Sequence, residues 1–223
     1  MGLRNKCRRL LFSARGRIAQ VAIGSYERLL GITTAGELKA PEYGYAHGIY
    51  RPTSWLVLRE LFRSLDVDEN DTFVDVGSGM GRVVLMAARR PFRRIIGVER
   101  SEEFNEVARS NIARNRHRLL CDDIEFLSVD AQQWEVPDDV TVVYLYCPFP
   151  SPIFERLVEN LIASIDRAPR HVRVIYTFST REDRDVLLRT GQAQPISFKV
   201  PRYVRSRFEE VSMFRLLPSG WDG

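Results

Sequence analysis

The stretch "TFVDVGSGMGRVV", residues 72–84, is an apolar run that breaks into three glycines within five positions and then becomes apolar again. The apolar run predicts a buried strand, and "GRVVLMAARR" predicts a helix that starts directly after the glycines. A glycine-rich turn between a strand and its helix lets a ligand approach backbone amides and the positive end of the helix dipole. The stretch therefore predicts a ligand site where the first strand passes into its helix.

Segments with strand and helix periodicity alternate along the chain. Further strands are predicted at 93–99, 123–130, 139–147 and 170–178, and helices at 52–65, 101–120 and 151–165. Such alternation is typical of a parallel sheet covered by helices on both faces. The strand at 139–147 is apolar almost throughout, which predicts a central position in the sheet.

The last third of the chain predicts a helix at 181–190 and two strands at 193–200 and 207–217. No helix-length segment separates these two strands, so we expect them to pair as an antiparallel hairpin. The predicted fold class is α/β: a seven-stranded, mostly parallel, doubly wound sheet with an antiparallel last strand, helices on both faces and an N-terminal helical arm.

Composition limits the kind of protein that this chain can be. With 223 residues, 44% of them hydrophobic, it can bury one sizeable core. No apolar stretch approaches the roughly 18 residues that a membrane span requires. The three cysteines, Cys7, Cys121 and Cys147, lie far apart in the sequence, which disfavours a disulfide framework or a zinc site. A reducing cytoplasm is the compartment that this pattern predicts.

Residues 1–40 predict a basic amphipathic helical arm in front of a main domain at 41–223. Residues 1–30 carry seven Lys/Arg against one acidic residue, Glu27, whereas the remainder of the chain is about neutral. We expect the apolar side of the arm to pack on the domain and its arginines to be solvated. The alternatives are contact with an anionic membrane surface, with RNA phosphates or with a second copy of the chain.

The spacing of the glycines disfavours a dinucleotide. That pattern is G-x-G-x-x-G/A, whereas here the third glycine arrives one position early and Asp75 lies two positions before Gly77. A carboxylate there would repel a pyrophosphate and attract an ammonium group, so we expect a ligand with an amino-acid portion. Glu99 and Asp130 end the second and third strands, where they could accept hydrogen bonds from ribose hydroxyls and from an adenine amine. A nicotinamide-dependent oxidoreductase is therefore disfavoured.

The motifs "VDVGSGMGR", "IGVE" and "LSVDA" resemble the cofactor-binding motifs of class I S-adenosylmethionine-dependent methyltransferases. The glycine turn, followed by Val-Val, is especially similar to the non-SET histone lysine methyltransferases and to bacterial relatives of unassigned substrate. The resemblance covers about residues 50–217 and implies S-adenosylmethionine as the cofactor. The cofactor-binding residues that it implies are Thr53, Asp75, Gly77, Ser78, Gly79, Gly81, Glu99, Asp130, Ala131 and Tyr146.

The segment "PEYGYAHGIYRPT", residues 41–53, precedes the first helix of the fold. In the class it resembles, this region folds over the methionine end of the cofactor, which predicts a lid. By the same resemblance, Thr53 and Tyr50 correspond to residues that contact the cofactor carboxylate and shape the methyl channel. Tyr43 and Tyr45 are expected to bind substrate, and His47 to be the one candidate base among the histidines. The alternative is an ordered linker whose tyrosines fill the edge of the core.

The acceptor is expected beyond the fourth strand, at "YLYCPFP", residues 144–150. Amine methyltransferases commonly carry Asn/Asp-Pro-Pro-Tyr or Asn-Pro-Phe there, whereas this chain has Cys147 in place of the amide or carboxylate. A thiol is a weak hydrogen-bond partner for an amine, although Pro148 and Phe149 keep the shape of the motif as acceptor-binding candidates. Cys147 itself is a candidate nucleophile or, more commonly for such a position, a buried core residue.

These observations favour a methyltransferase that acts on a small molecule or a glycan. The alternatives are a protein lysine N-methyltransferase, suggested by the glycine turn, and an RNA methyltransferase that uses the basic arm. No metal is predicted, because nothing resembles the Asp/Glu/Asn set of metal-dependent catechol-type methyltransferases.

Overall fold

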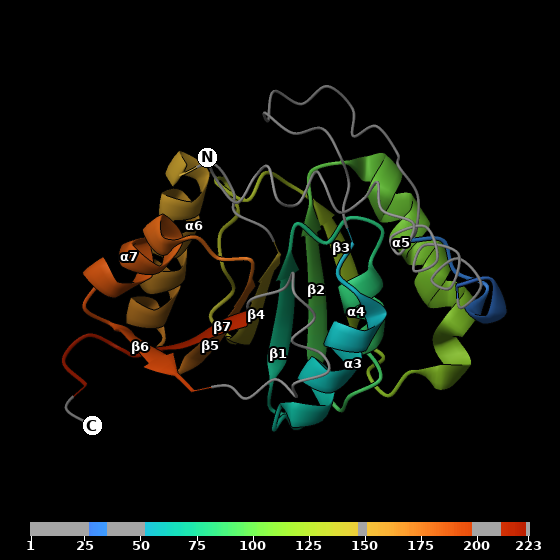
Figure 1. The fold of residues 1–223 in the computed structure, drawn as a ribbon, viewed down its shortest axis with the longest axis horizontal. Coiled ribbons are helices and arrows are strands. Elements are labelled where there is room, and N and C mark those ends of the chain that lie inside the picture. Colours follow the sequence, from blue (N-terminus) through green and yellow to red (C-terminus); the bar gives the residue numbers. More distant parts are fainter. Residues whose placement is uncertain (1–26, 35–51, 147–150, 198–210, 222–223) are drawn as a thin grey trace, which may run out of the picture.

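The computed structural model describes residues 27–34, 52–146, 151–197 and 211–221, and they contain a seven-stranded sheet (Figure 1). The strand order is β3-β2-β1-β4-β5-β7-β6. Neighbouring strands from β3 to β5 run parallel, whereas β7 is antiparallel to both β5 and β6. The predicted α/β class, the central position of β4 and the antiparallel closing hairpin are confirmed. The strands are β1 (Thr72–Val76), β2 (Arg94–Glu99), β3 (Ile124–Ser128), β4 (Val140–Tyr146), β5 (Val172–Thr177), β6 (Ala193–Ile196) and β7 (Val211–Leu216).

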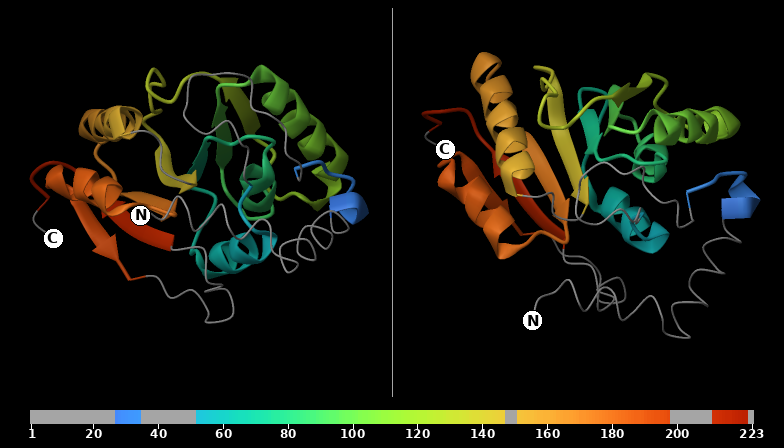
Figure 2. Two further views of the ribbon diagram at one scale, coloured as in Figure 1. Left: turned by 45° about the horizontal axis from the view of Figure 1, so that its top comes forward. Right: turned by 90° about the horizontal axis from the view of Figure 1, so that it is seen from above.

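Helices cover both faces of this sheet, as Figure 2 shows. One face packs against α3, α4 and α5, and the other against α6 and α7, so the apolar side chains form two cores on either side of the sheet. Along β1 the side chains alternate, with Phe73 in the first core and Val74 and Val76 in the second. The helices are α3 (Trp55–Ser64), α4 (Arg82–Ala87), α5 (Glu102–Asn115), α6 (Ser151–Arg167) and α7 (Arg181–Arg189), with a short 3-10 helix, η1 (Arg116–Arg118), after α5.

Local signals in the sequence fix several of these boundaries. The Ser101 hydroxyl accepts the Phe104 N–H at 3.3 Å and caps α5, whose first turn carries two glutamates. Strand β3 ends at Ser128, two residues earlier than predicted, because the chain turns at Asp130. The Gln132 N–H donates to Asp130 Oδ1 and the Gln133 N–H to the Asp130 carbonyl. Asp130 therefore lies in a turn just past the strand instead of at its last position.

Residues 27–34 pack against the main domain. Positions 27–30 are helical, and the residues after them lie along α5. Asn111 Nδ2 donates to the Thr33 carbonyl and Asn111 Oδ1 accepts the Thr33 N–H, both at 2.9 Å, while Asn115 Nδ2 donates to the Leu30 carbonyl. The remainder of the predicted arm and the predicted lid up to residue 51 lie outside the described residues, so the arm and its boundary at residue 40 stay predictions.

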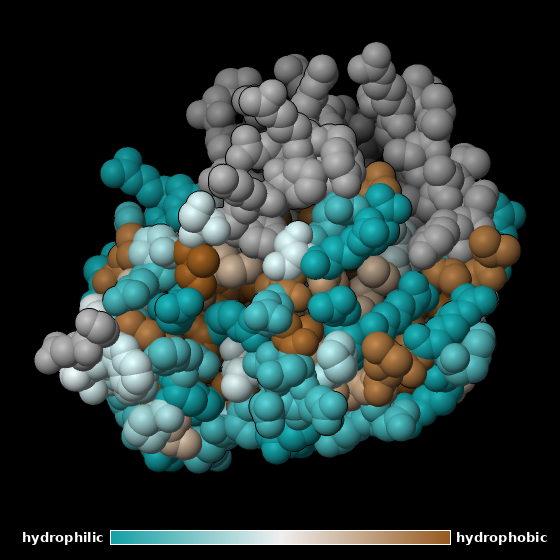
Figure 3. All heavy atoms as spheres, turned by 90° about the horizontal axis from the view of Figure 1, so that it is seen from below, coloured by the Kyte–Doolittle hydropathy of each residue, from teal (hydrophilic) through white to brown (hydrophobic). Residues whose placement is uncertain are grey.

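The described surface is mainly hydrophilic. On the face shown in Figure 3, hydrophobic residues occur singly or in small groups among hydrophilic ones, as is normal for a solvated surface. Leu29 (79% exposed) and Leu120 (68%) are the most exposed large hydrophobic residues of the described segments. None of the helices that could be searched is both long and apolar enough to cross a bilayer.

Candidate functional site

The glycine turn joins β1 to α4 and is held against β2. The N–H groups of Gly77 and Ser78 both donate to the Val98 carbonyl, at 2.8 and 3.0 Å, and the Gly81 N–H donates to the Ser78 carbonyl. Gly81 has a φ of 76°, in the left-handed region that favours glycine. A Cβ at Gly81 would lie 2.8 Å from the Ala108 Cβ, so α5 also packs too closely for a side chain there. The turn is consequently fixed in position, with Gly77 exposed and Gly79 and Gly81 buried.

Asp75, in the middle of β1, has an unusual environment for a carboxylate. It is 2% exposed, and its Oδ2 has no hydrogen-bond partner. Burial raises the pKa of the Asp75 carboxyl well above its ordinary value, and the nearby Glu99 carboxylate raises it further. A buried carboxylate oxygen without a partner is costly to a protein, so the position of Asp75 favours a ligand that brings a positive charge.

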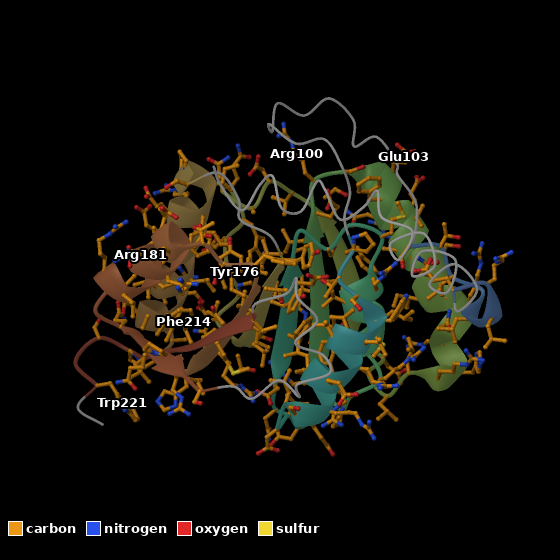
Figure 4. The ribbon with its side chains drawn as sticks, viewed as in Figure 1. Arg100, Glu103, Tyr176, Arg181, Phe214 and Trp221 are labelled. Atoms are coloured by element: carbon orange, nitrogen blue, oxygen red, sulfur yellow. The ribbon has the colours of Figure 1, made fainter. Side chains whose placement is uncertain are left out.

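Glu99, the last residue of β2, contacts the glycine turn directly. Its Oε2 accepts the Gly79 N–H at 3.0 Å and its Oε1 accepts the Ser101 N–H at 2.9 Å. Burial raises the pKa of the Glu99 carboxyl, and backbone hydrogen bonds from Ser101, Gly79 and Arg100 partly offset that rise. Arg100 and Glu103, labelled in Figure 4, mark the edge of the sheet where β2 ends and α5 begins.

Strand register brings the acidic residues to one face of the sheet. Asp75 on β1 is paired with Gly97 on β2, two residues before Glu99, so all three residues face the side covered by α3, α4 and α5. The absence of a side chain at Gly97 lets Phe126 and Ser78 approach its backbone, because a Cβ there would lie 2.6 Å from a ring carbon of Phe126 and 2.9 Å from Ser78 Oγ. Ser78 Oγ is itself buried without a partner. Gly97 lies in the "IGVE" motif, but no local pattern distinguishes it from other glycines.

Asp130, Ala131 and Tyr146 lie near the same carboxyl edge. Asp130 Oδ2 is 3.7 Å from an Arg100 guanidinium nitrogen, which places the turn after β3 beside the end of β2. Ala131 follows in that turn and is half-buried. Tyr146 ends β4, where its ring meets that of Phe178 edge-on at 5.5 Å. Phe178, just beyond β5, has a φ of 62°, a conformation that non-glycine residues adopt uncommonly and that recurs at functional sites.

Thr53 belongs to a buried chain of hydroxyl groups that sequence reasoning missed. Thr53 Oγ1 lies 2.8 Å from the Tyr144 hydroxyl, which lies 3.1 Å from Thr177 Oγ1. Tyr144 is on β4 and Thr177 ends β5, so the three hydroxyl groups form a row over neighbouring strands on one face of the sheet. Tyr144 is the partner of Asp75 in the strand register. In the sequence, Tyr144 is one more large residue of an apolar strand. Nothing in that strand indicates that its hydroxyl meets Thr53 and Thr177.

Arg82, the first residue of α4, is the second feature that the sequence did not reveal. Its side chain is 2% exposed and forms a salt bridge of 2.5 Å with Glu27. It also donates to Thr34 Oγ1 at 2.7 Å and to the Thr53 carbonyl at 2.8 Å, and its guanidinium lies over the Trp55 ring. Arg82 thereby joins the segment 27–34, the residues before α3 and the helix that follows the glycine turn.

The remaining predicted acceptor and catalytic residues lie outside the described residues: Tyr43, Tyr45, His47, Tyr50, Cys147, Pro148 and Phe149. Their roles stay predictions. The other two histidines are at the surface, with His117 in η1 and His171 in edge-on contact with the Trp221 ring. In the described part of the chain, no group of three or more His, Cys, Asp or Glu residues could hold a metal ion.

Known structures share this architecture. A ribosomal protein L11 methylase from Lactobacillus delbrueckii subsp. bulgaricus superposes with a TM-score of 0.51 at 15% identity, over 73% of this chain and 77% of that one. A Streptococcus mutans protein solved in complex with SAH superposes with a TM-score of 0.51 at 11% identity, over 75% and 100%. The fold is that of the class I methyltransferases. The fold that the resemblance drawn from the sequence implies is confirmed.

Sequence comparison adds a narrower similarity within this class. The family model described as "Histone methylation protein DOT1" matches residues 31–134, which include the glycine turn, Glu99 and Asp130. The Drosophila melanogaster "Histone-lysine N-methyltransferase, H3 lysine-79 specific" is 38% identical over 55 residues, which are 24% of this chain and 3% of the relative. The chain thus matches only a small part of that much longer protein.

Proposed function

We propose that this class I methyltransferase transfers the methyl group of S-adenosylmethionine to the side-chain amine of a lysine in a protein. The observation that carries the cofactor assignment is the buried Asp75 carboxylate, whose Oδ2 has no partner, beside a glycine turn that is held against β2. S-adenosylmethionine supplies an electrophilic methyl group and carries a positively charged ammonium. The residues present fit this cofactor.

The described residues would bind and orient the cofactor in distinct ways. Asp75 would pair with the ammonium group, which removes the cost of its unpartnered oxygen. Glu99 is tied to the Gly79 N–H and would accept from the ribose hydroxyls, and Asp130 would accept from the adenine amine. Methyl transfer from a sulfonium is an in-line displacement, so holding the two reactants in line and excluding water would supply most of the acceleration.

Two observations favour a lysine acceptor over the small molecule or glycan that the sequence motif at Cys147 favoured. The family model and the Drosophila relative both belong to histone lysine methylation, and the family model matches the part of the chain that carries the glycine turn. In addition, the rings of Tyr146 and Phe178 meet where β4 and β5 end, beside the segment that was predicted to hold the acceptor. Aromatic rings there would contact the methylene chain of a lysine and its cationic end.

A small molecule or glycan remains the second candidate acceptor, because Cys147 stands where amine methyltransferases of this class carry Asn or Asp. A weak hydrogen-bond partner at that position suits an acceptor whose reacting atom needs no hydrogen bond from it.

The test uses S-adenosylmethionine with a labelled methyl group, added to a lysate of the source organism that is then fractionated into protein, RNA and small-molecule or glycan pools. We expect label in protein, recovered as methyl-lysine after hydrolysis. Asp75→Asn, which keeps the side-chain shape and removes the charge, is the blank. Label confined to the small-molecule or glycan pool would support the second candidate. If no pool gains label above the blank, although the wild-type chain binds S-adenosylmethionine, the methyltransferase proposal fails.

A further inference from the structure

The hydroxyl chain of Thr53, Tyr144 and Thr177 is buried beside the cofactor-binding face and has no role in the proposal above. Thr53 is 2% exposed, and Tyr144 and Thr177 are fully buried. The Tyr144 hydroxyl lies 2.8 Å from Thr53 Oγ1 and 3.1 Å from Thr177 Oγ1. Tyr144 is therefore the central member, and it contacts one residue from before α3 and one from the end of β5.

When an anion is bound at Thr53, the number of protons available fixes which of the three hydroxyls donates to which. Each hydroxyl has one proton to donate and lone pairs with which to accept. If Thr53 donates its proton to an anionic ligand, it must accept from Tyr144, and Tyr144 must then accept from Thr177. Donation by each hydroxyl to the next strengthens the last hydrogen bond, because a polarised hydroxyl is a better donor.

Thr53 is linked to the glycine turn through Arg82 and to the neighbour of Asp75 in the sheet through Tyr144. Arg82 Nη1 donates to the Thr53 carbonyl at 2.8 Å, so the Thr53 backbone is held from the side of the glycine turn. Tyr144 is paired with Asp75 across β4 and β1, and both side chains face α3, α4 and α5. A carboxylate acceptor and a hydroxyl donor thus stand side by side, as an α-amino acid group requires for its ammonium and its carboxylate.

We propose that Tyr144 is a positioning residue for the α-carboxylate of the cofactor, acting through Thr53. The inference rests on the proposed use of S-adenosylmethionine, with Asp75 at the ammonium, and on the contact between Thr53 and the cofactor carboxylate that the family resemblance implies. It adds the role of Tyr144, whose hydroxyl supports that of Thr53. Tyr144 itself does not touch the cofactor. Its hydroxyl fixes where the Thr53 hydroxyl points and orients the Thr53 proton toward the ligand.

The experiment compares two ligands that differ only in the carboxylate: S-adenosylmethionine and decarboxylated S-adenosylmethionine, both of which keep the ammonium and the sulfonium. Dissociation constants are measured by calorimetry for the wild-type chain and for Tyr144→Phe. We expect Tyr144→Phe to weaken S-adenosylmethionine binding about 3- to 10-fold, the range for one lost hydrogen bond, and to leave the decarboxylated ligand unchanged. Asp75→Asn is the matched comparison and should weaken both ligands.

Two further variants keep the result interpretable. Thr53→Val should show the same ligand selectivity, and Tyr144→Phe should add little to it, because both substitutions remove one and the same contact. If Tyr144→Phe does not fold, Thr177→Val takes its place. It should weaken S-adenosylmethionine binding by a smaller factor and again leave the decarboxylated ligand unchanged. Equal weakening of both ligands in these variants would mean that the hydroxyls only support the fold, and the inference would be wrong. If the wild-type chain binds neither ligand, the proposed function itself fails.

Discussion

At the scale of single residues, Asp75 is a group whose position costs stability. Its pKa is raised, so the folded chain holds the proton more tightly than the unfolded chain, and stability falls as the pH rises through the unfolded pKa toward the folded one. Replacing the carboxylate by an amide removes a charge that cannot be hydrated in the folded state. The same replacement removes the proposed partner of the cofactor ammonium, so stability and binding should change in opposite directions.

We therefore expect Asp75→Asn, without ligand at neutral pH, to be more stable than the wild type by about 1 kcal/mol or more, a rise in Tm of about 2–4 °C per kcal/mol. The difference should shrink as the pH is lowered toward the ordinary carboxyl pKa of about 4. Adding S-adenosylhomocysteine should raise the Tm of the wild type only. Thermal unfolding from pH 5 to pH 8 measures both effects, with exposed Glu103→Gln as the control. A less stable Asp75→Asn would show that the carboxylate is satisfied within the protein.

At the scale of elements, the sequence predicted each helix and strand of the sheet to within a few residues, because hydrophobic periodicity and glycine punctuation are local signals. Asp75 and Glu99 were found as candidates because they belong to contiguous motifs. Gly97, Tyr144 and Arg82 were not, because their importance depends on which side chains approach them from other elements. Thr53 and Tyr144, for example, are separated by 91 positions in the sequence and meet only when α3 packs on β4.

Gly97 shows how closely β2, β3 and the glycine turn are packed. Its backbone does not need glycine, so Gly97→Ala should act only by crowding the Phe126 ring and Ser78 Oγ. We expect a loss of about 1–3 kcal/mol in the free energy of unfolding, measured with urea. Gly97→Ala combined with Phe126→Leu should be less destabilised than the two single changes added together, because the smaller side chain makes room. Simple additivity would mean that the ring is not what the new methyl group meets.

At the scale of the whole molecule, a buried ion pair helps to attach residues 27–34 to the domain, in addition to their hydrogen bonds with α5. Glu27 Oε1 accepts from Arg82, from the Thr34 hydroxyl and from the Trp55 indole N–H. The side chains of Arg82 and Glu27 are 2% and 4% exposed, so water cannot solvate either charge when the other is removed. From composition alone, Glu27 is assigned to the basic arm. Only the fold brings it into contact with Arg82 of α4, 55 positions later in the sequence.

The burial of the Glu27–Arg82 pair, and not its separation, should decide how much it contributes to the free energy of unfolding. The pair Arg93–Asp139 has the same nitrogen–oxygen separation of 2.5 Å, but its side chains are 51% and 32% exposed. Glu27→Gln should lower the free energy of unfolding by about 3 kcal/mol, because it leaves the Arg82 charge buried without its counterion. Asp139→Asn, the same chemical change in the exposed pair, should cost no more than about 1 kcal/mol. Urea unfolding of both variants measures the difference, and Glu27→Gln with Arg82→Met should recover part of the loss since no charge then remains buried. Equal effects at the two pairs would mean that the hydrogen bonds that Arg82 donates to Thr34 and to the Thr53 carbonyl are enough to stabilise its charge. Residues 27–34 would then be held chiefly by their contacts with α5.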